Sequence, residues 1–116
     1  TTAIYEERAD AKLSGAEHAY NILRTKVLQQ MQRHNWNMAA LTSPAIGNGK
    51  TTTAVNLAIS IARSANHTVL LVDLNLHNPS IHEHFGVEPV FGVTDVVSGK
   101  VGFEDAVFNP GIPRLT

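Results

Sequence analysis

A glycine-rich segment that ends in a lysine and three threonines has the residue types and spacing to bind a polyphosphate. Residues 47–53 read Gly-Asn-Gly-Lys-Thr-Thr-Thr and lie between a short apolar run and a longer apolar segment. Glycines let the backbone bend and approach a ligand closely. The N-terminus of a following helix adds free N–H groups and a partial positive charge. Lys50 can then reach the β- and γ-phosphates, and the Thr51 hydroxyl can ligate Mg²⁺.

The complete phosphate-loop (Walker A) pattern is Gly, any four residues, Gly, Lys and then Ser or Thr. Its first glycine is replaced by Pro44 in this sequence, while the remainder of the pattern is present. The plain alternative is an ordinary glycine-rich turn with a solvated lysine. The position of the loop between a predicted strand and an apolar helix favours nucleotide phosphate binding. We therefore expect phosphate contacts from Gly47, Asn48, Gly49, Lys50, Thr51 and Thr52.

The carboxylate of Asp73 is a second candidate, because it ends an apolar run over residues 68–72. In a parallel sheet, ligands bind at the carboxyl ends of the strands. This carboxylate would then hold Mg²⁺, directly or through water, or orient an attacking hydroxyl. The alternative is a side chain that caps the following turn. The pattern favours the functional role.

Local patterns predict the elements that must position these side chains. Residues 1–13 have no clear periodicity, so we expect a flexible lead-in. Residues 14–17 read Ser-Gly-Ala-Glu, the pattern of a capping box, which predicts a helix to about residue 34. The apolar stripe of this helix consists of Tyr20, Leu23, Val27 and Met31. Asn35, Trp36 and Asn37 should end it.

The segments around the loop predict a parallel sheet. Residues 38–42 are typical of a buried strand, residues 50–65 of a helix, and residues 68–73 of a strand covered on both faces. The buried side of that helix should consist of Ala54, Leu57, Ala58, Ile61 and Ala62. The order strand, loop, helix, strand indicates a right-handed βαβ unit. Short helical turns are expected near 79–85, 95–98 and 103–108, and a third strand should begin at 114–116.

Two or three parallel strands cannot cover both faces and both edges of a sheet by themselves. We therefore expect an α/β fold of the three-layer P-loop NTPase type, of which residues 14–116 form the N-terminal portion. For the chain on its own this predicts low stability, or dimerisation through an open sheet edge.

Composition excludes several classes of function. The 116 residues carry a net charge of −1 and include no cysteine, which excludes disulfides and thiolate zinc sites. The charge balance gives no basis for nucleic-acid binding. No apolar run approaches the ~20 residues of a membrane span, and the polar N-terminus is unlike a signal peptide. These features fit a cytoplasmic protein. The histidines His77, His82 and His84 do not suggest a metal site, because residues two apart on a helix face different ways.

Several segments together resemble the bacterial tyrosine autokinases, the P-loop kinases of capsule and exopolysaccharide synthesis. The resemblance covers about residues 17–116. It rests on residues 42–44, 47–53, 56–58, 69–73, 78–79 and 82–86, and on Leu-Arg-Thr at 23–25 and Phe-Gly-Val-Thr-Asp-Val at 91–96.

The resemblance implies ATP and Mg²⁺ as cofactors and phosphoryl transfer to tyrosines. In the family these tyrosines form a C-terminal cluster, often on a neighbouring subunit, which implies a homo-oligomer. Family members work beside a membrane-embedded activator and control polysaccharide chain length or export, which implies a location at the inner face of the cell membrane through that partner. The third nucleotide motif and the tyrosine cluster are absent from the 116 residues, so we expect this chain alone to be inactive.

By the same resemblance, Gly47, Gly49, Lys50 and Thr51 bind phosphate and Mg²⁺, and Lys50 and Asp73 are the catalytic residues. Asp73 matches the first acid of the family's Asp-x-Asp-x-Arg motif. The second acid is Asn75 here and the arginine is His77. Asn75 offers Mg²⁺ a carbonyl oxygen but no charge, so the implied ligands are Thr51, Asp73 and Asn75, with reduced affinity. The family's Glu-x-x-Arg-x-x-Arg helix motif is matched only at Arg24, since His18 and Asn21 replace the other two.

Two other functions remain open. The first is an ATPase switch of the ParA and MinD kind, although those proteins have a second lysine where Ala45 stands here. The second is a degenerate copy that binds nucleotide and regulates a partner without catalysis, which Asn75 and His77 would mark.

Overall fold

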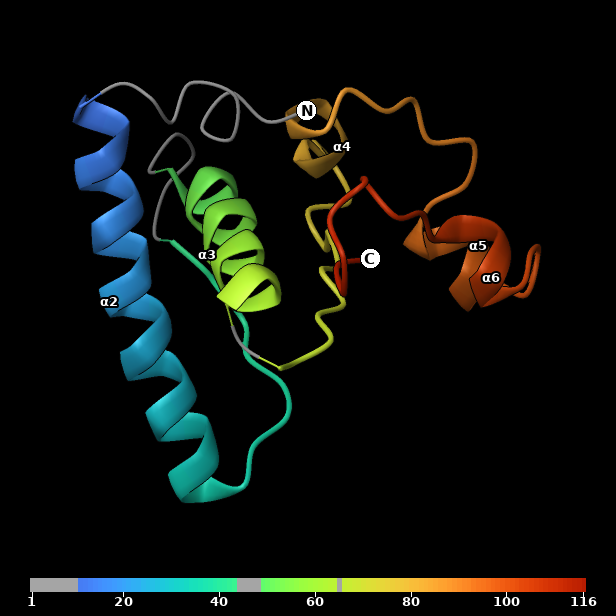
Figure 1. Cartoon of the computed structure of the whole chain (residues 1–116). Helices are drawn as coiled ribbons and strands as arrows, with labels where there is room; N and C mark the ends of the chain where they lie inside the picture. The colour runs from blue at the N-terminus through green and yellow to red at the C-terminus, as the bar shows by residue number, and fades with distance from the viewer. Residues whose placement is uncertain (1–10, 44–48, 65) are drawn as a thin grey trace.

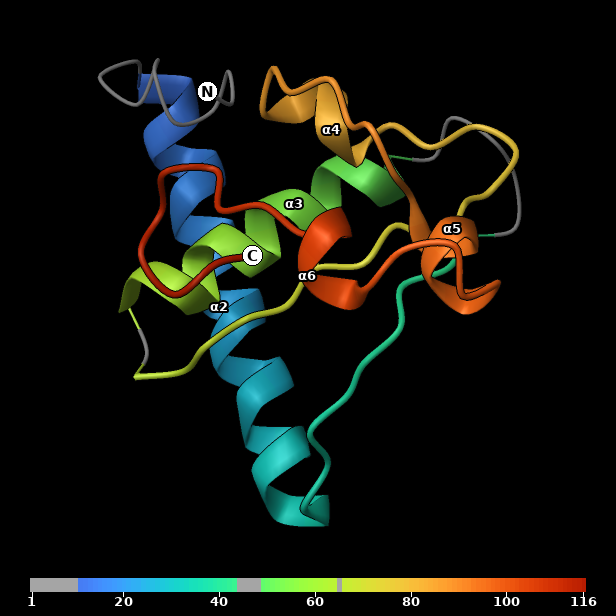
Figure 2. The same cartoon turned by 90° about the vertical axis from the view of Figure 1, so that its right-hand side faces the viewer.

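The structure of the chain, a computed structural model, describes residues 11–43, 49–64 and 66–116. Two long helices, α2 (Ala11–His34) and α3 (Lys50–Ser64), pack against each other (Figure 1). Three short helices follow: α4 (Ile81–His84), α5 (Val93–Val97) and α6 (Phe103–Ala106). Figures 1 and 2 show α3 in the middle, with α2 on one side and the non-helical segments 66–80 and 107–116 on the other.

Helix α2 begins earlier than the capping-box pattern predicts. The predicted cap at residues 14–17 lies inside the helix, which starts at Ala11, so this boundary was wrong. Residues 1–10 of the predicted lead-in lie outside the described residues, and 11–13 belong to α2. A Ser-x-x-Glu pattern is a local signal, and a helix can continue through it when the preceding residues also favour helix.

The C-terminus of α2 is where the sequence predicts it. Asn35 adopts the left-handed conformation with φ 56°. The Trp36 N–H donates to the Met31 carbonyl at 2.8 Å, and the Asn35 N–H donates to the Gln32 carbonyl at 3.3 Å. This pair of bonds is a Schellman motif, which satisfies carbonyls that the helix itself leaves unpaired. Asparagine tolerates the required backbone angle better than most residues.

A polar cluster joins α2 to α3. The Arg24 guanidinium donates to the Asn21 side chain at 3.0 Å and to the Ser60 hydroxyl at 3.1 Å, and it also bonds the Ser64 hydroxyl. Ser60 in turn donates to Asn21 at 3.1 Å. The predicted apolar stripe of α2 is half-buried throughout. Arg24 is therefore used within the chain, in the contact between its two long helices.

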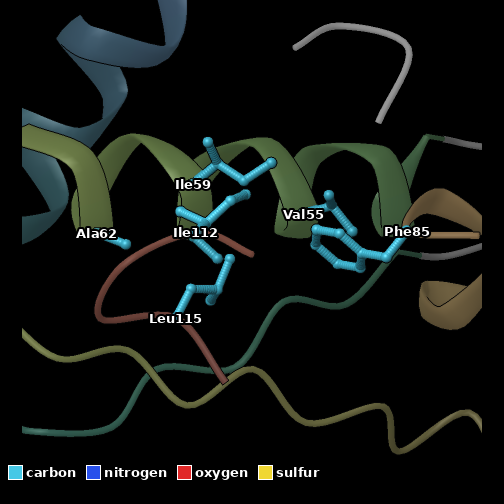
Figure 3. Close-up of a cluster of buried hydrophobic side chains, with 7 residues drawn as sticks. Val55, Ile59, Ala62, Phe85, Ile112 and Leu115 are labelled. Carbon is cyan, nitrogen blue, oxygen red and sulfur yellow. The ribbon is translucent and has the colours of Figure 1, made fainter. Parts of the chain in front are cut away.

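The core lies on the side of α3 that faces away from α2. Val55, Ile59 and Ala62 are buried there against Phe85, Ile112 and Leu115 (Figure 3). The predicted buried side of α3 is therefore right for Leu57, Ala58 and Ala62, which are buried, while Ala54 and Ile61 are half-buried. Val55 and Ile59 are buried as well, because the helix is covered on two sides rather than one.

The described residues contain one parallel β-bridge, between Val69 and Leu115. The Val69 N–H donates to the Arg114 carbonyl at 2.7 Å, and the Leu71 N–H donates to the Thr116 carbonyl at 2.8 Å. The 68–73 segment is thus paired in parallel at this bridge. The predicted start of a third strand at residue 114 was wrong, because Arg114 lies in a turn with φ 67°, and the bridge residue is Leu115. The Arg114 side chain also caps α3, since its Nε donates to the Ala62 carbonyl at 2.9 Å.

Two strand predictions need correction. Val69 and Leu71 pack on the core, but Leu70 is 51% exposed and Val72 is 46% exposed, so this segment is covered on one face only. Residues 38–42 are extended but exposed, with Met38 at 82%, and they pair with no other described segment. An extended segment becomes a stable strand only through pairing and burial against neighbours. Among the described residues nothing supplies these for 38–42.

Short helices occur near all three predicted places after Asp73, and none of their ends is shifted by more than two residues. None of the helices in the described parts of the chain has both the length and the apolar character needed to cross a membrane.

Candidate functional site

The first turn of α3 contains the described part of the predicted phosphate loop. Gly49 has φ +74°, and no atom lies within 4 Å of the position that a Cβ would take there. The backbone angle, and not lack of space, therefore requires glycine at this position. The other predicted loop residues Gly47 and Asn48, together with Pro44, lie outside the described residues.

The first backbone N–H groups of α3 have no partner within the helix. The first backbone bond of α3 runs from the Thr53 N–H to the Gly49 carbonyl at 2.9 Å. The N–H groups of Lys50, Thr51 and Thr52 precede this bond, so the helix ladder leaves them unpaired. The first turn carries no acidic residue. Together with the helix dipole and the Lys50 ammonium, these donors make this end of α3 attractive to an anion.

Asp73 caps the start of α4. Its Oδ2 accepts from the backbone N–H groups of Ser80 at 2.9 Å and Ile81 at 3.0 Å. Its Oδ1 accepts from the backbone N–H of Asn75 at 3.0 Å. The capping role that the sequence leaves as the alternative is therefore present. It does not use the whole carboxylate, because each oxygen has two acceptor sites and Oδ1 accepts only one of these N–H groups.

Ser80 connects Asp73 to α3. Its backbone N–H bonds Asp73, and its hydroxyl donates to the Thr51 hydroxyl at 3.3 Å. Thr51 and Asp73, far apart in the sequence, thus lie on two sides of one serine. Asn75 is exposed and follows Asp73 in the same turn. Sequence reasoning missed Ser80 as a site residue: Pro-Ser at 79–80 predicted the start of a short helix, and this is the only signal that could have drawn attention to it.

His84 makes a second connection between α4 and the first turn of α3. Its Nδ1 lies 3.1 Å from the Ser80 carbonyl, and its Nε2 lies 3.3 Å from the Thr52 hydroxyl. Among the described residues no group of three or more His, Cys, Asp and Glu side chains is arranged to hold a metal ion.

Comparison with known proteins places the chain in a protein family. The chain is 35% identical over 88 residues to the tyrosine-protein kinase YwqD of Bacillus subtilis, which covers 76% of the chain and 37% of that protein. It is 32% identical over 113 residues to the tyrosine-protein kinase CpsD of Streptococcus agalactiae, covering 94% of the chain and 48% of CpsD. The chain belongs to the bacterial tyrosine-protein kinase family.

A third member of this tyrosine-protein kinase family, CpsD of Streptococcus pneumoniae, is 34% identical over 101 residues, which are 86% of the chain and 43% of that protein. The chain thus spans less than half the length of each of these three relatives. No family model and no solved structure matches it.

An apolar groove of about 440 Å³ lies beside Asp73. Most of its lining is apolar and includes Leu70, Val72, Val90 and Phe103. The charge that Asp73 contributes to this lining is negative. The groove is therefore unsuited to a polyphosphate, and the first turn of α3 remains the better phosphate site.

We expect Asp73→Ala to lower the free energy of unfolding of the chain by about 1–3 kcal/mol, since three backbone N–H groups lose a charged acceptor. Urea titration followed by circular dichroism measures this change. Glu88→Ala removes an exposed carboxylate and is the matched control. Equal stability of Asp73→Ala and the unchanged chain would contradict the capping role.

Proposed function

We propose that the chain binds ATP and Mg²⁺ as the nucleotide-binding portion of a protein-tyrosine autokinase. The observation that carries this proposal is the contact of Ser80 with both Thr51 and Asp73. It joins the two sequence signals for nucleotide binding, which were inferred independently, at one end of α3. The family membership of the chain supports the same function.

The phosphates would lie at the first turn of α3. Backbone N–H groups from Lys50 to Thr52 would donate to phosphate oxygens, together with the loop residues Gly47, Asn48 and Gly49. Lys50 is half-buried at the start of the helix, and its ammonium would hold the β- and γ-phosphates as a point charge. Because the N–H groups are fixed by the helix, little ordering is required when the anion binds.

The residues near Ser80 fit Mg²⁺, since they offer only oxygen atoms. Thr51 supplies a hydroxyl, Asp73 an incompletely used Oδ1, and Asn75 a side-chain carbonyl, and Mg²⁺ prefers oxygen ligands. When bound, Mg²⁺ would neutralise charge on the phosphate oxygens during phosphoryl transfer. The backbone hydrogen bonds of Asp73 hold its carboxylate in one orientation, in which it would ligate Mg²⁺ directly or through a water molecule.

The remaining features of the autokinase are part of the same proposal. The chain would form the first part of a three-layer P-loop fold with a parallel sheet, which the Val69–Leu115 bridge supports. The complete protein would transfer the γ-phosphoryl group to tyrosines of a neighbouring copy. It would work with a membrane-embedded activator at the cytoplasmic face of the membrane, in the control of capsule or exopolysaccharide synthesis.

Calorimetric titration with ATP, with and without Mg²⁺, tests the binding proposal. We expect saturable binding of ATP that becomes tighter when Mg²⁺ is added. Adenosine, which has no phosphates, is the control ligand and should bind much more weakly. No binding of ATP with or without Mg²⁺ would contradict the proposal.

A nucleotide-binding regulator without kinase activity is the second candidate. The use of Asp73 as a cap and the neutral side chain of Asn75 favour it, because both reduce the negative charge available to Mg²⁺. Transfer of labelled phosphate from ATP to tyrosine by the complete protein separates the two. Transfer would favour the kinase, and binding of ATP without transfer would favour the regulator.

A further inference from the structure

His84 contacts the proposed nucleotide site, although the phosphate-loop pattern does not include it and the family resemblance assigns it no role. It is the last residue of α4, and its ring lies between the Ser80 carbonyl and the Thr52 hydroxyl. Thr52 belongs to the first turn of α3, directly after Thr51. The two ring nitrogens of His84 therefore join the capped end of α4 to a hydroxyl at the phosphate site.

The hydrogen-bond partners define the protonation of the neutral ring. A carbonyl oxygen only accepts, so Nδ1, 3.1 Å from the Ser80 carbonyl, must carry the hydrogen. In the neutral imidazole Nε2 is then an acceptor, and the Thr52 hydroxyl, 3.3 Å away, must donate to it. The proton of the Thr52 hydroxyl is consequently unavailable to a phosphate oxygen.

Protonation of His84 reverses the second bond. Both ring nitrogens of the imidazolium are donors, so Nε2 would donate to the Thr52 oxygen while Nδ1 keeps its bond to Ser80. The Thr52 hydroxyl could then turn its own proton toward a phosphate. The imidazolium would also add a positive charge beside the first turn of α3. A bound polyphosphate attracts this charge, whereas the partial positive charge of the helix N-terminus without a ligand repels it.

Some of the charged groups around His84 favour its protonation and others oppose it. Lys50 on α3 opposes a second positive charge when no phosphate is present. Asp73, which bonds the Ser80 N–H, and Glu83 on α4 favour the charge, and His82 is a further ionisable side chain on α4. A bound polyphosphate adds several negative charges near His84, and these favour the imidazolium.

We infer that His84 is a further phosphate-site residue, which acts through Thr52 and whose protonated form binds the nucleotide more tightly. This inference rests on the proposed nucleotide binding. By linkage, a ligand that favours the protonated form takes up protons when it binds, and its affinity rises as the pH falls. The ligand class is a nucleoside di- or triphosphate, since a free nucleoside carries no charge to interact with His84.

The test compares the affinity of the full chain for ATP in the presence of Mg²⁺ at pH 6 and pH 8, for the unchanged sequence, His84→Gln and His67→Gln. His67 is an exposed histidine outside α4 and serves as the matched control. For each protein we take the ratio of its ATP affinity at pH 6 to its ATP affinity at pH 8. Because ATP itself titrates, this ratio is compared between the three proteins and not read on its own. We expect this ratio to be about three- to tenfold larger for the unchanged chain and His67→Gln than for His84→Gln.

A second measurement needs no variant of His84. The imidazole signal of His84 in an NMR pH titration should report a higher pKa with ATP and Mg²⁺ bound than without nucleotide. Equal pH ratios in all three proteins, or an unchanged His84 titration, would overturn this inference and leave the nucleotide site intact. Absence of ATP binding at both pH values would overturn the proposed function and the inference with it.

Discussion

Replacing Lys50 with alanine is expected to weaken ATP binding by about ten- to a hundredfold. Lys50 begins α3, directly after a glycine with a left-handed backbone, and no acid shares the first turn with it. A charge-assisted hydrogen bond contributes about 1.5–3 kcal/mol. Each 1.4 kcal/mol is about tenfold in affinity. Since the ammonium would contact the β- and γ-phosphates, the loss should be larger for ATP than for AMP.

Calorimetric titration of the unchanged chain, Lys50→Ala and Lys100→Ala with ATP and AMP measures this effect. Lys100→Ala is the control, because Lys100 is a largely exposed lysine that pairs with Asp95 at 3.9 Å and lies outside the proposed site. Thermal unfolding of Lys50→Ala should resemble that of the unchanged chain, so that a loss of affinity cannot be attributed to unfolding. If Lys50→Ala bound ATP as tightly as the unchanged chain, phosphate binding at α3 would be disproved.

Replacing Leu115 with alanine should have the largest effect on stability, about 2–5 kcal/mol of unfolding free energy. Leu115 is 1% exposed and is among the two largest fully buried side chains in the described residues. It also lies in the parallel bridge to Val69. Truncation would remove apolar contacts with α3 and leave a cavity between that helix and the paired segments.

Urea denaturation of Leu115→Ala and Val97→Ala tests this expectation. Val97 is 81% exposed, so its truncation should change the unfolding free energy by less than about 0.5 kcal/mol. Since the core is small, the Leu115 variant should be largely unfolded at moderate urea concentrations. Similar midpoints for the two variants would mean that the segment from residue 114 does not pack on α3 in solution.

The features that the sequence alone determined are those that depend on local backbone chemistry. Asn35 ends α2 because it tolerates the left-handed angle, and Gly49 precedes α3 because its φ of +74° requires glycine. The apolar run around Val69 predicted an extended segment in parallel pairing, and the motifs of the loop and of Asp73 predicted the kinase family. Each of these signals lies within a few consecutive residues or in a motif with fixed spacing.

The tertiary structure decided which of these segments find partners. Met38 and Leu70 have the same apolar character as Val69, yet they are exposed, because burial depends on what lies opposite in space and not on the residue type. The connection of Ser80 to Thr51 and of His84 to Thr52 depends on where α4 lies against α3, and no local pattern encodes that. The sequence by itself thus determined the chemical groups of the candidate site and the family. Only the tertiary structure decided that Asp73 caps α4 and that His84 reaches the first turn of α3.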